Sequence, residues 1–368
     1  MFGGVFGGKM VWLSGATGFK GAWLAEWLLQ LGARVHSYSL APAAEAALFN
    51  QLQLARRIEH EVADIRDAAA VRRSLLAVQP DWVFHLAAQS LVRPSYEQPV
   101  LTYETNVMGT VHVLDALRLL EKPCGAVMVT SDKCYENREW LHGYREEDPL
   151  GGRDPYSSSK AAAEIAIASW QRSFFANHPV RVTSARAGNV IGGGDWAAER
   201  IFPDGIRALA AHEPIPVRNP QAVRPWQHVL EPLSGYLCLA AHSVRTNGLD
   251  PDGTPFSTAF NFGPGHEANR TVRDLVEELL RHWPGRWEDR SDPAAVHEAR
   301  LLQLSTDKAR AILGWAPLWN FSEAVERTAT WYRGAVAQPD PASVSELTRA
   351  QIAAFVDRAV GAGVSWSK

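Results

Sequence analysis

The first half of the chain alternates short apolar runs with amphipathic stretches. Between the first two runs, Trp23, Trp27 and Leu31 recur at helical spacing and form one apolar face. Strands that alternate with helical crossovers are typical of a parallel, doubly wound sheet, so we predict an α/β fold. The predicted strands span residues 10–15, 33–40, 82–88, 126–132 and 180–190.

The pattern changes after residue 190, where glycines and prolines divide the chain into loops and short elements. We therefore predict a second, smaller α/β domain there, and divide the chain into the segments 1–190, 191–335 and 336–368. In the later segments we predict amphipathic helices at 271–282, 322–332 and 346–360, and a linker at 338–343.

Composition excludes several classes of protein. Hydrophobic residues make up 46% of the 368 residues and charged residues 21%, which argues against a disordered chain. The net charge of -3 lacks the basic excess of a nucleic-acid-binding protein, so an anionic ligand has to meet local cations. There is no run of ~18 apolar residues and no cationic leader, so we expect a cytoplasmic protein with no membrane partner.

Three cysteines, Cys124, Cys134 and Cys238, are scattered without a CxxC pair. This spacing argues against a disulfide framework and against a structural zinc site. We expect a reducing compartment and no bound metal.

A glycine-rich segment, Gly15-Ala-Thr-Gly18-Phe-Lys-Gly21, follows the first predicted strand and opens the first helix. Glycines let the backbone approach a pyrophosphate closely, and the helix N-terminus offers N–H groups to its charge. This context favours a Rossmann-type dinucleotide site over a simple packing turn. The candidate residues are Gly15, Thr17, Gly18, Phe19, Lys20 and Gly21.

The second strand leaves the choice of dinucleotide open. It reads His36-Ser-Tyr-Ser-Leu40, without an acid for the ribose of NAD and without a following arginine for the 2′-phosphate of NADP. Asp64 and Ile65, after the next strand, are placed to meet an adenine edge. A helix N-cap is an equally good interpretation of Asp64.

Tyr156 and Lys160 stand at i and i+4, on one face of a helix that Asp154 and Pro155 start well. A nearby cation favours phenolate, so we expect Lys160 to lower the pKa of Tyr156. Such a tyrosine can take a proton from a hydroxyl group while hydride leaves the carbon. By itself this spacing also fits a solvated helix face.

Polar residues end the fourth predicted strand, which reads Thr130-Ser131-Asp132-Lys133. Ligands of open α/β sheets bind at the carboxyl ends of the strands. Ser131 offers a hydroxyl group that can share a substrate proton, and Asp132 and Lys133 add an acid and a base that a simple redox site does not need. The alternative is a loop with solvated charges.

These residues lie in long motifs, and through them the chain resembles the CDP-glucose 4,6-dehydratases, which are extended short-chain dehydrogenases/reductases. The resemblance covers nearly the whole chain, and one departure is Ala16, where that family usually has His. It rests on Thr17-Gly-Phe-Lys-Gly21, His85-Leu-Ala-Ala-Gln89, Thr105-Asn-Val-Met-Gly-Thr110, Thr130-Ser-Asp-Lys-Cys-Tyr-Glu-Asn-Arg-Glu-Trp140, Gly143-Tyr-Arg-Glu146, Asp154-Pro-Tyr-Ser157, Arg186-Ala-Gly-Asn-Val-Ile-Gly-Gly-Gly-Asp-Trp196 and Arg224-Pro-Trp-Gln-His-Val-Leu-Glu-Pro232.

The resemblance implies an NAD-dependent lyase that oxidises CDP-glucose at C4, removes water across C5 and C6, and returns the hydride to C6. Tyr156, assisted by Lys160 and Ser131, would take the 4-hydroxyl proton. Asp132 would protonate the leaving hydroxyl, and Lys133 would stand where related dTDP-glucose dehydratases have a glutamate base. Residues 1–190 would bind NAD, 191–335 mainly the sugar nucleotide, and 336–368 would form a C-terminal helix and tail. Further cofactor contacts would come from Leu86, Ala87, Ala88 and Gln89.

The resemblance also places the substrate. The diphosphate of the substrate needs hydrogen-bond donors and cations nearby. Each candidate arginine could serve this purpose, or could instead form an ordinary ion pair on the protein surface. Only Asn189 and Arg224 lie within long family motifs. Members of the superfamily commonly dimerise through the helix after Asn106 and the helix that carries Tyr156, so we expect a homodimer or a dimer of dimers. The candidate substrate-binding residues are Asn189, Arg200, Arg218, Arg224 and Arg300.

Two rival functions stay open. A dehydratase or epimerase of another nucleotide sugar would share Tyr156 and Lys160, although epimerisation at C4 has no use for the Asp132-Lys133 pair. A non-catalytic dinucleotide-binding protein would have no use for an activated phenol. The leading hypothesis is an enzyme of deoxysugar biosynthesis, as in lipopolysaccharide or O-antigen synthesis.

Fourteen tryptophans are an unusually large number. We predict that Trp12, Trp23, Trp27 and Trp82 belong to the core, because they lie in strands or on an apolar helical face. Trp140, Trp196 and Trp226 lie within the family motifs, where a nucleotide sugar would bind. Aromatic rings offer apolar surface to a ligand, and whether these three contact the nucleotide sugar is left open by the sequence.

Overall fold

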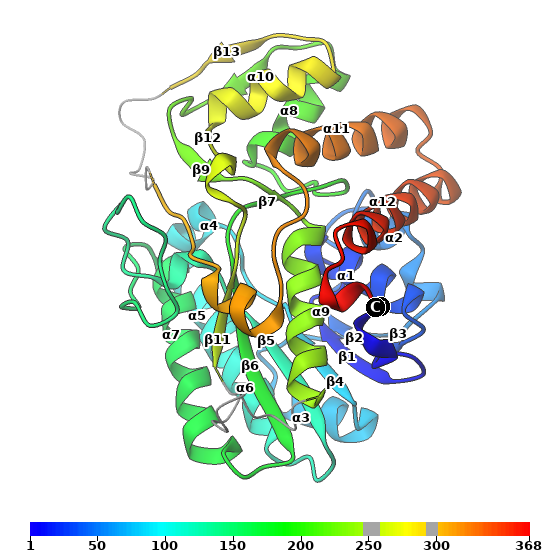
Figure 1. The fold of residues 1–368 in the computed structure, drawn as a ribbon, viewed down its shortest axis with the longest axis vertical. Coiled ribbons are helices and arrows are strands. Elements are labelled where there is room, and N and C mark those ends of the chain that lie inside the picture. Colours follow the sequence, from blue (N-terminus) through cyan, green and yellow to red (C-terminus); the bar gives the residue numbers. More distant parts are fainter. Residues whose placement is uncertain (246–257, 292–300) are drawn as a thin grey trace.

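A seven-stranded parallel sheet forms the centre of the computed structural model, which describes residues 1–245, 258–291 and 301–368 (Figure 1). The strands lie in the order β11-β6-β5-β4-β1-β2-β3, and every neighbouring pair runs parallel. The predicted α/β class with a doubly wound sheet is confirmed. The strands are β1 (Met10–Ser14), β2 (Arg34–Ser39), β3 (Glu59–Val62), β4 (Trp82–His85), β5 (Cys124–Val129), β6 (Val180–Ala187) and β11 (Ala259–Phe262).

Side chains alternate between the two faces of the sheet, so each face has its own hydrophobic core. Val11 and Leu13 of β1 join the larger core, while Trp12 between them joins the smaller one. The larger core is completed by α1 (Phe19–Gln30), α9 (Leu230–Arg245) and α12 (Pro341–Gly361), and the smaller core by α3 (Ala68–Val78), α6 (Gly109–Leu117) and α7 (Pro155–Trp170).

Each of the five predicted runs overlaps a strand of the central sheet. The other two strands of this sheet, β3 and β11, are not marked by a comparable apolar run in the sequence. All four residues of β3 are at least partly exposed, and only the position of Asp64 after it implies a strand. The short strand β11 comes from the segment 191–335, as does α9, so this segment contributes to the central sheet and its covering layer. The boundary at residue 190 stays a prediction.

The remaining elements surround the ends of the strands. Figure 1 shows α8, α10 and β13 gathered at one end of the molecule, beyond the sheet. The helices are α2 (Leu48–Gln51), α4 (Val92–Glu97), α5 (Pro99–Tyr103), α8 (Ile201–Ala210), α10 (Val272–His282) and α11 (Phe321–Ala337). Three short strand pairs join β7 (Val190–Ile191) to β10 (Gln227–His228), β8 (Ile215–Val217) to β13 (Trp287–Asp289), and β9 (Val223–Pro225) to β12 (Asn269–Thr271).

Capping side chains set the helix ends in the later segments. Thr271 and Asp274 form a capping box at the start of α10, where a helix is predicted. The predicted linker is too long, because α12 already begins at Pro341, where Asp340 accepts hydrogen bonds from the next two free backbone N–H groups. None of the helices in the described part of the chain is long and apolar enough to cross a membrane.

Candidate active site

One large cavity, with a volume of about 1560 Å³, opens where β1, β3, β4 and β5 end. All predicted cofactor residues line it, and so do the three polar residues after β5. The structure therefore brings together Gly15, Thr17, Gly18, Phe19, Lys20, Gly21, Asp64, Ile65, Leu86, Ala87, Ala88, Gln89, Ser131, Asp132, Lys133, Tyr156 and Lys160.

The glycine loop combines a tight turn with an open helix N-terminus. Gly15 has φ +77°, and a Cβ atom on Gly21 would lie 2.1 Å from the Gly15 carbonyl oxygen. Gly18 is the N-cap of α1, and its own Cβ would meet only that oxygen, at 3.4 Å. Gly15 and Gly21 thus close the turn, and the first N–H groups of α1 face the cavity as a pyrophosphate requires.

Replacing Gly21 by Ala is expected to destabilise the folded protein by about 2 kcal/mol, because the added methyl group forces the glycine loop apart. Gly18→Ala is the matched control, since its Cβ has room, and it should cost well under half as much. Urea unfolding of both variants measures the difference, and equal losses would contradict the role given to Gly21.

A chain of buried, hydrogen-bonded side chains fixes the backbone next to the glycine loop. Ser14 Oγ lies 2.7 Å from His85 Nδ1, and His85 Nε2 lies 3.2 Å from Thr110 Oγ1. The N–H groups of Leu86 and Ala87 both donate to Ser14 Oγ. Burial, followed by the charge of Lys160, lowers the pKa of His85 to about 3, so this ring is neutral and acts as a structural link.

The end of the second strand is fastened to the glycine loop. Ala16 N donates to Ser39 Oγ, and Thr17 Oγ1 donates to the Leu40 carbonyl oxygen. Neither contact distinguishes NAD from NADP.

The carboxylate of Asp64 is paired with Arg66, whose Nη2 lies 2.6 Å from Asp64 Oδ2. The N-cap interpretation of Asp64 is wrong, because Asp67 caps α3 by accepting a hydrogen bond from Ala70 N. Arg66 also lines the cavity and was not among the predicted site residues. The only feature of the sequence that points to it is its position two residues after Asp64.

Helix α7 carries the phenol and the ammonium group. Asp154 caps it by accepting a hydrogen bond from Ser157 N, and Pro155 occupies its first turn. Tyr156 and Lys160 are both buried on the cavity side, at 7% and 5% exposure, so a solvated helix face is ruled out. Lys160 Nζ donates to the Val129 carbonyl oxygen at the end of β5, 3.5 Å away.

In this structure burial outweighs the neighbouring charges in setting the pKa of the Tyr156 phenol. Burial raises the pKa of Tyr156 to about 12; Ser131 and Arg200 oppose this rise, and Asp132 adds to it. Lys160 is not among the main causes. Burial also lowers the pKa of Lys160 to about 8. At neutral pH the phenol is protonated, so a further positive charge has to favour its ionisation.

Asp132 and Lys133 form a close pair at the end of β5. Lys133 Nζ lies 3.5 Å from Asp132 Oδ1 and 3.3 Å from Asn189 Oδ1. Ser131 Oγ donates to Asp132 Oδ1, whereas Asp132 Oδ2 is buried and has no hydrogen-bond partner within the part of the chain that the structure describes. Because Asp132 is only 1% exposed, a loop of solvated charges does not describe this site.

Cations gather around the cavity although the whole chain carries a net charge of -3. Burial lowers the pKa of Lys20 to about 8, Asp132 opposes this, and the charges of Arg200, Lys160 and Lys133 lower it further. Such a cluster suits an anionic ligand.

The candidate substrate residues Asn189, Arg200, Arg218 and Arg224 also line the cavity, and Arg300 lies outside the described residues. Arg200 Nη1 lies 2.7 Å from Asp195 Oδ2. Arg218 lies 3.5 Å from the carboxylates of both Glu199 and Asp204. These two arginines are thus ion-paired and still border the cavity.

Another cavity residue, Arg93 of α4, was missed because no motif marks it. Its Nη1 lies 2.9 Å from Glu199 Oε1.

The tryptophans divide much as predicted. Trp12, Trp23, Trp27 and Trp82 are buried in the core. Trp196 and Trp226 line the cavity. Trp140 does not line it, and its placement with the nucleotide sugar is wrong: its ring stacks on Tyr144, with centroids 5.6 Å apart.

Comparison with known proteins shows the family. The family model described as GDP-mannose 4,6 dehydratase matches residues 13–328. The chain belongs to this family. A curated relative from Salmonella typhimurium, named CDP-glucose 4,6-dehydratase, is 44% identical over 342 residues, which cover 90% of this chain and 93% of the relative. A dTDP-glucose 4,6-dehydratase from Streptomyces antibioticus is 34% identical over 275 residues, 73% of this chain and 75% of that protein.

Two solved structures share the fold of this chain. A dTDP-glucose 4,6-dehydratase from Streptomyces venezuelae, with NAD and TYD bound, matches with a TM-score of 0.74 at 24% identity, over 88% of this chain and 97% of that one. A UDP-glucose 4-epimerase from Thermotoga maritima, with UDP-glucose, matches with a TM-score of 0.75 at 20% identity, over 88% and 98%.

Proposed function

We propose that the protein is an NAD-dependent CDP-glucose 4,6-dehydratase. The Salmonella relative of that name is 44% identical over almost the full length of both chains, and this observation carries the proposal. The Asp132-Lys133 pair beside Tyr156 supports dehydration, since epimerisation at C4 needs neither an acid at C6 nor a base at C5.

The cavity fits a dinucleotide. The glycine turn has no room for a Cβ atom on Gly21, and the N-terminus of α1 faces the cavity. Asp64 and Ile65 also line the cavity. NAD, when bound, accepts a hydride from sugar C4 and gives it back at C6. Tyr156 lines the same cavity, and its phenolate form would be favoured by the positive charge that oxidised NAD would bring there.

In the first step Tyr156 takes the proton of the glucose 4-hydroxyl group as the C4 hydride leaves. Ser131, whose hydroxyl opposes the raised pKa of Tyr156, shares that proton. Lys160, one turn along α7, carries the positive charge that balances the phenolate.

In the second step the 4-keto group acidifies the C5 proton. Lys133, as the neutral amine, removes that proton, and Asp132, as the carboxylic acid, gives a proton to the C6 hydroxyl group, which leaves as water. The pair therefore enters this step with the proton between the two groups on the carboxyl side. Their 3.5 Å separation lets the two groups act on neighbouring carbons of one sugar ring. Hydride then adds to C6 and a proton returns to C5, so the sugar undergoes no net oxidation.

The substrate diphosphate would meet Asn189, Arg200, Arg218 and Arg224, which lie along the wall of the cavity beyond Lys133. Arg200 is paired with Asp195, and Arg218 with Glu199 and Asp204, so the diphosphate would compete with these carboxylates for the two arginines.

Exposed apolar side chains support a homodimer or a dimer of dimers. Val100, Met108, Ile165 and Phe174 are 70%, 45%, 58% and 48% exposed, and they lie on α5, α7 and the turns that follow them. A subunit contact over these elements would bury such side chains. We place the enzyme in the cytoplasm, as a supplier of 4-keto-6-deoxy sugar nucleotides for deoxysugar biosynthesis.

The direct test is to incubate the purified protein with NAD and, separately, with CDP-, dTDP-, GDP- and UDP-glucose. We expect a 4-keto-6-deoxy product from CDP-glucose at a rate at least about ten-fold above the others, corresponding to ~1.4 kcal/mol of discrimination. If dTDP-glucose reacts fastest, the base preference is wrong and the chemistry stands. If no sugar nucleotide reacts, the dehydratase proposal is wrong.

A further inference from the structure

A buried carboxylate, Glu164, lies four residues after Lys160 on α7. Residues at this spacing are neighbours on one helix face. Glu164 is 3% exposed and belongs neither to the cavity lining nor to the reaction steps above. A buried carboxylate without partners would be very costly, so its contacts explain why it is present.

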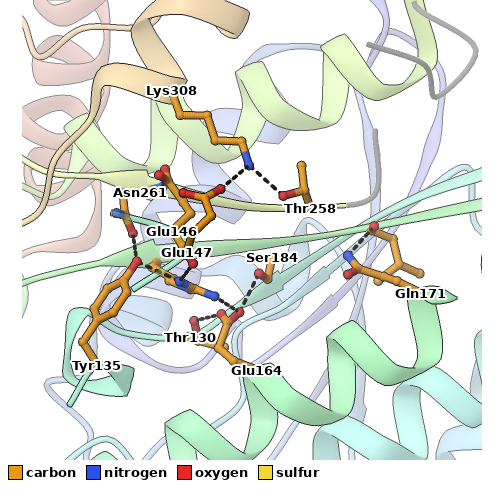
Figure 2. A network of polar contacts seen from close by, with 12 residues as sticks. Thr130, Tyr135, Glu146, Glu147, Glu164, Gln171, Ser184, Thr258, Asn261 and Lys308 are labelled. Carbon is orange, nitrogen blue, oxygen red and sulfur yellow. Dashed lines mark hydrogen bonds and ion pairs between the residues drawn. The ribbon is translucent and has the colours of Figure 1, made fainter. Parts of the chain in front are cut away.

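Figure 2 shows these contacts. Glu164 accepts a hydrogen bond from Thr130 Oγ1, another from Ser184 Oγ at 2.9 Å, and an ion-paired one from Arg186 Nη2 at 2.8 Å. Thr130, Ser184 and Arg186 are 7%, 1% and 4% exposed. The carboxylate thus joins helix α7 to the end of β5 and to β6 through three buried donors.

The network continues away from the helix. Arg186 Nη1 donates to Tyr135 Oη and to the Glu146 carbonyl oxygen, and Tyr135 Oη donates to Asn261 Oδ1 on β11 (Figure 2). Tyr135 follows the Asp132-Lys133 pair by two residues. Both sides of that pair are therefore tied to Glu164, through Thr130 before it and through Tyr135 after it.

Two hydrogen bonds connect helix α7 to adjacent residues at the end of strand β5. Lys160 Nζ donates to the Val129 carbonyl oxygen, and Thr130 Oγ1 donates to Glu164. Sliding the helix along the strand would break both. We propose that Glu164 is a positioning residue: its carboxylate fixes α7, with Tyr156 and Lys160, against the strand end that carries Ser131, Asp132 and Lys133, and stabilises the Lys160 ammonium group.

Electrostatics agree with this geometry. Burial lowers the pKa of Lys160 to about 8. Glu164 makes the largest contribution that raises this pKa, and Cys134 makes the next largest. Other titratable groups that face Lys160 are Lys20 of α1 and His85 of β4. Neutral His85 changes little with pH, and Lys20 repels the ammonium group. Glu164 is therefore the principal charge that keeps Lys160 protonated.

The inference rests on the proposed function and is tested in the full-length enzyme with Glu164→Gln. We follow the rate of the first hydride transfer by nicotinamide absorbance after mixing with CDP-glucose. The alkaline limb of its pH profile, where the rate stops rising, should begin about one pH unit lower than in the wild type, which makes the variant roughly ten-fold slower near pH ~9. A merely structural role would lower the rate equally at every pH.

Matched variants separate charge from packing. Ser184→Ala removes one hydrogen bond to Glu164 and leaves its charge, so the alkaline limb should stay in place; Glu164→Asp should restore much of it. If Glu164→Gln alone does not fold, the double variant with Arg186→Gln removes the buried pair together and should show the same shift.

Urea unfolding gives a readout independent of activity. A lysine whose pKa is about 8 when folded and 10.5 when unfolded makes the protein gain stability as pH rises between these values. In Glu164→Gln this gain should begin at a lower pH, and in a Lys160→Met background it should vanish. A wild-type enzyme inactive on CDP-glucose would overturn the function alone, whereas an unmoved alkaline limb and unmoved stability gain would overturn the role of Glu164.

Discussion

Tyr156→Phe is expected to lower the rate of hydride transfer from CDP-glucose by at least about 10³-fold, since the group that accepts the 4-hydroxyl proton is lost. The ring stays in place, because Tyr156 is buried on a helix capped by Asp154. Affinities for NAD and CDP-glucose should therefore change by only a few fold. Rapid mixing with absorbance at the reduced nicotinamide band measures the rate, and calorimetry measures the affinities.

Tyr236→Phe is the matched control for this experiment. Tyr236 is a second buried phenol close to Asp132 and Tyr156, and its hydroxyl group has no hydrogen-bond partner among the described residues. Removing it should leave the hydride transfer rate within about two-fold of the wild type. Equal losses in the two variants would mean that Tyr156 acts through packing and not as the base.

The pH dependence adds a second criterion. The pKa of Tyr156 is raised to about 12, so the phenol starts protonated and the first step should accelerate as pH rises. Loss of the Lys160 proton, with a pKa of about 8, opposes this at alkaline pH. The wild-type rate should therefore rise up to about pH 8 and level off above it, and this rise should be absent from the residual activity of Tyr156→Phe.

The part of this site that sequence predicts is the part carried by local spacing. The turn from Gly15 to Gly21 and the i, i+4 pair of Tyr156 and Lys160 follow from the geometry of one turn or one helix. The parallel order of the strands predicts that Ser131 meets them at one sheet edge. All of these residues line the same cavity.

Sequence could not predict properties that depend on burial and on distant partners. The pKa of Tyr156 is set by how completely the fold removes it from water, which outweighs the lysine one turn away. Asp64 pairs with Arg66 and leaves the N-cap to Asp67, although either aspartate fits the local pattern. Strand β11 is found only through its pairing with β6, far earlier in the chain.

Lys133→Ala is expected to stop the reaction after its first step. The contacts of Ser131 with Asp132 and the position of Tyr156 do not depend on the lysine side chain, so C4 oxidation should continue. Loss of the C5 base should slow elimination by about 10³-fold. Mixing the variant with CDP-glucose should give a stable burst of reduced nicotinamide without 4-keto-6-deoxy product. In deuterated water the wild type should incorporate deuterium at C5, and the variant should not.

Lys133→Arg decides whether the lysine acts as a base or only as a charge. Arginine keeps the cation beside Asp132 and Asn189 but does not lose its proton at any working pH. If Lys133 removes the C5 proton, the arginine variant should oxidise C4 and fail to eliminate, as Lys133→Ala does. If arginine restores product formation, the lysine holds Asp132 in place electrostatically, and the C5 proton leaves to another group. Normal product formation by Lys133→Ala itself would remove Lys133 from the elimination step altogether.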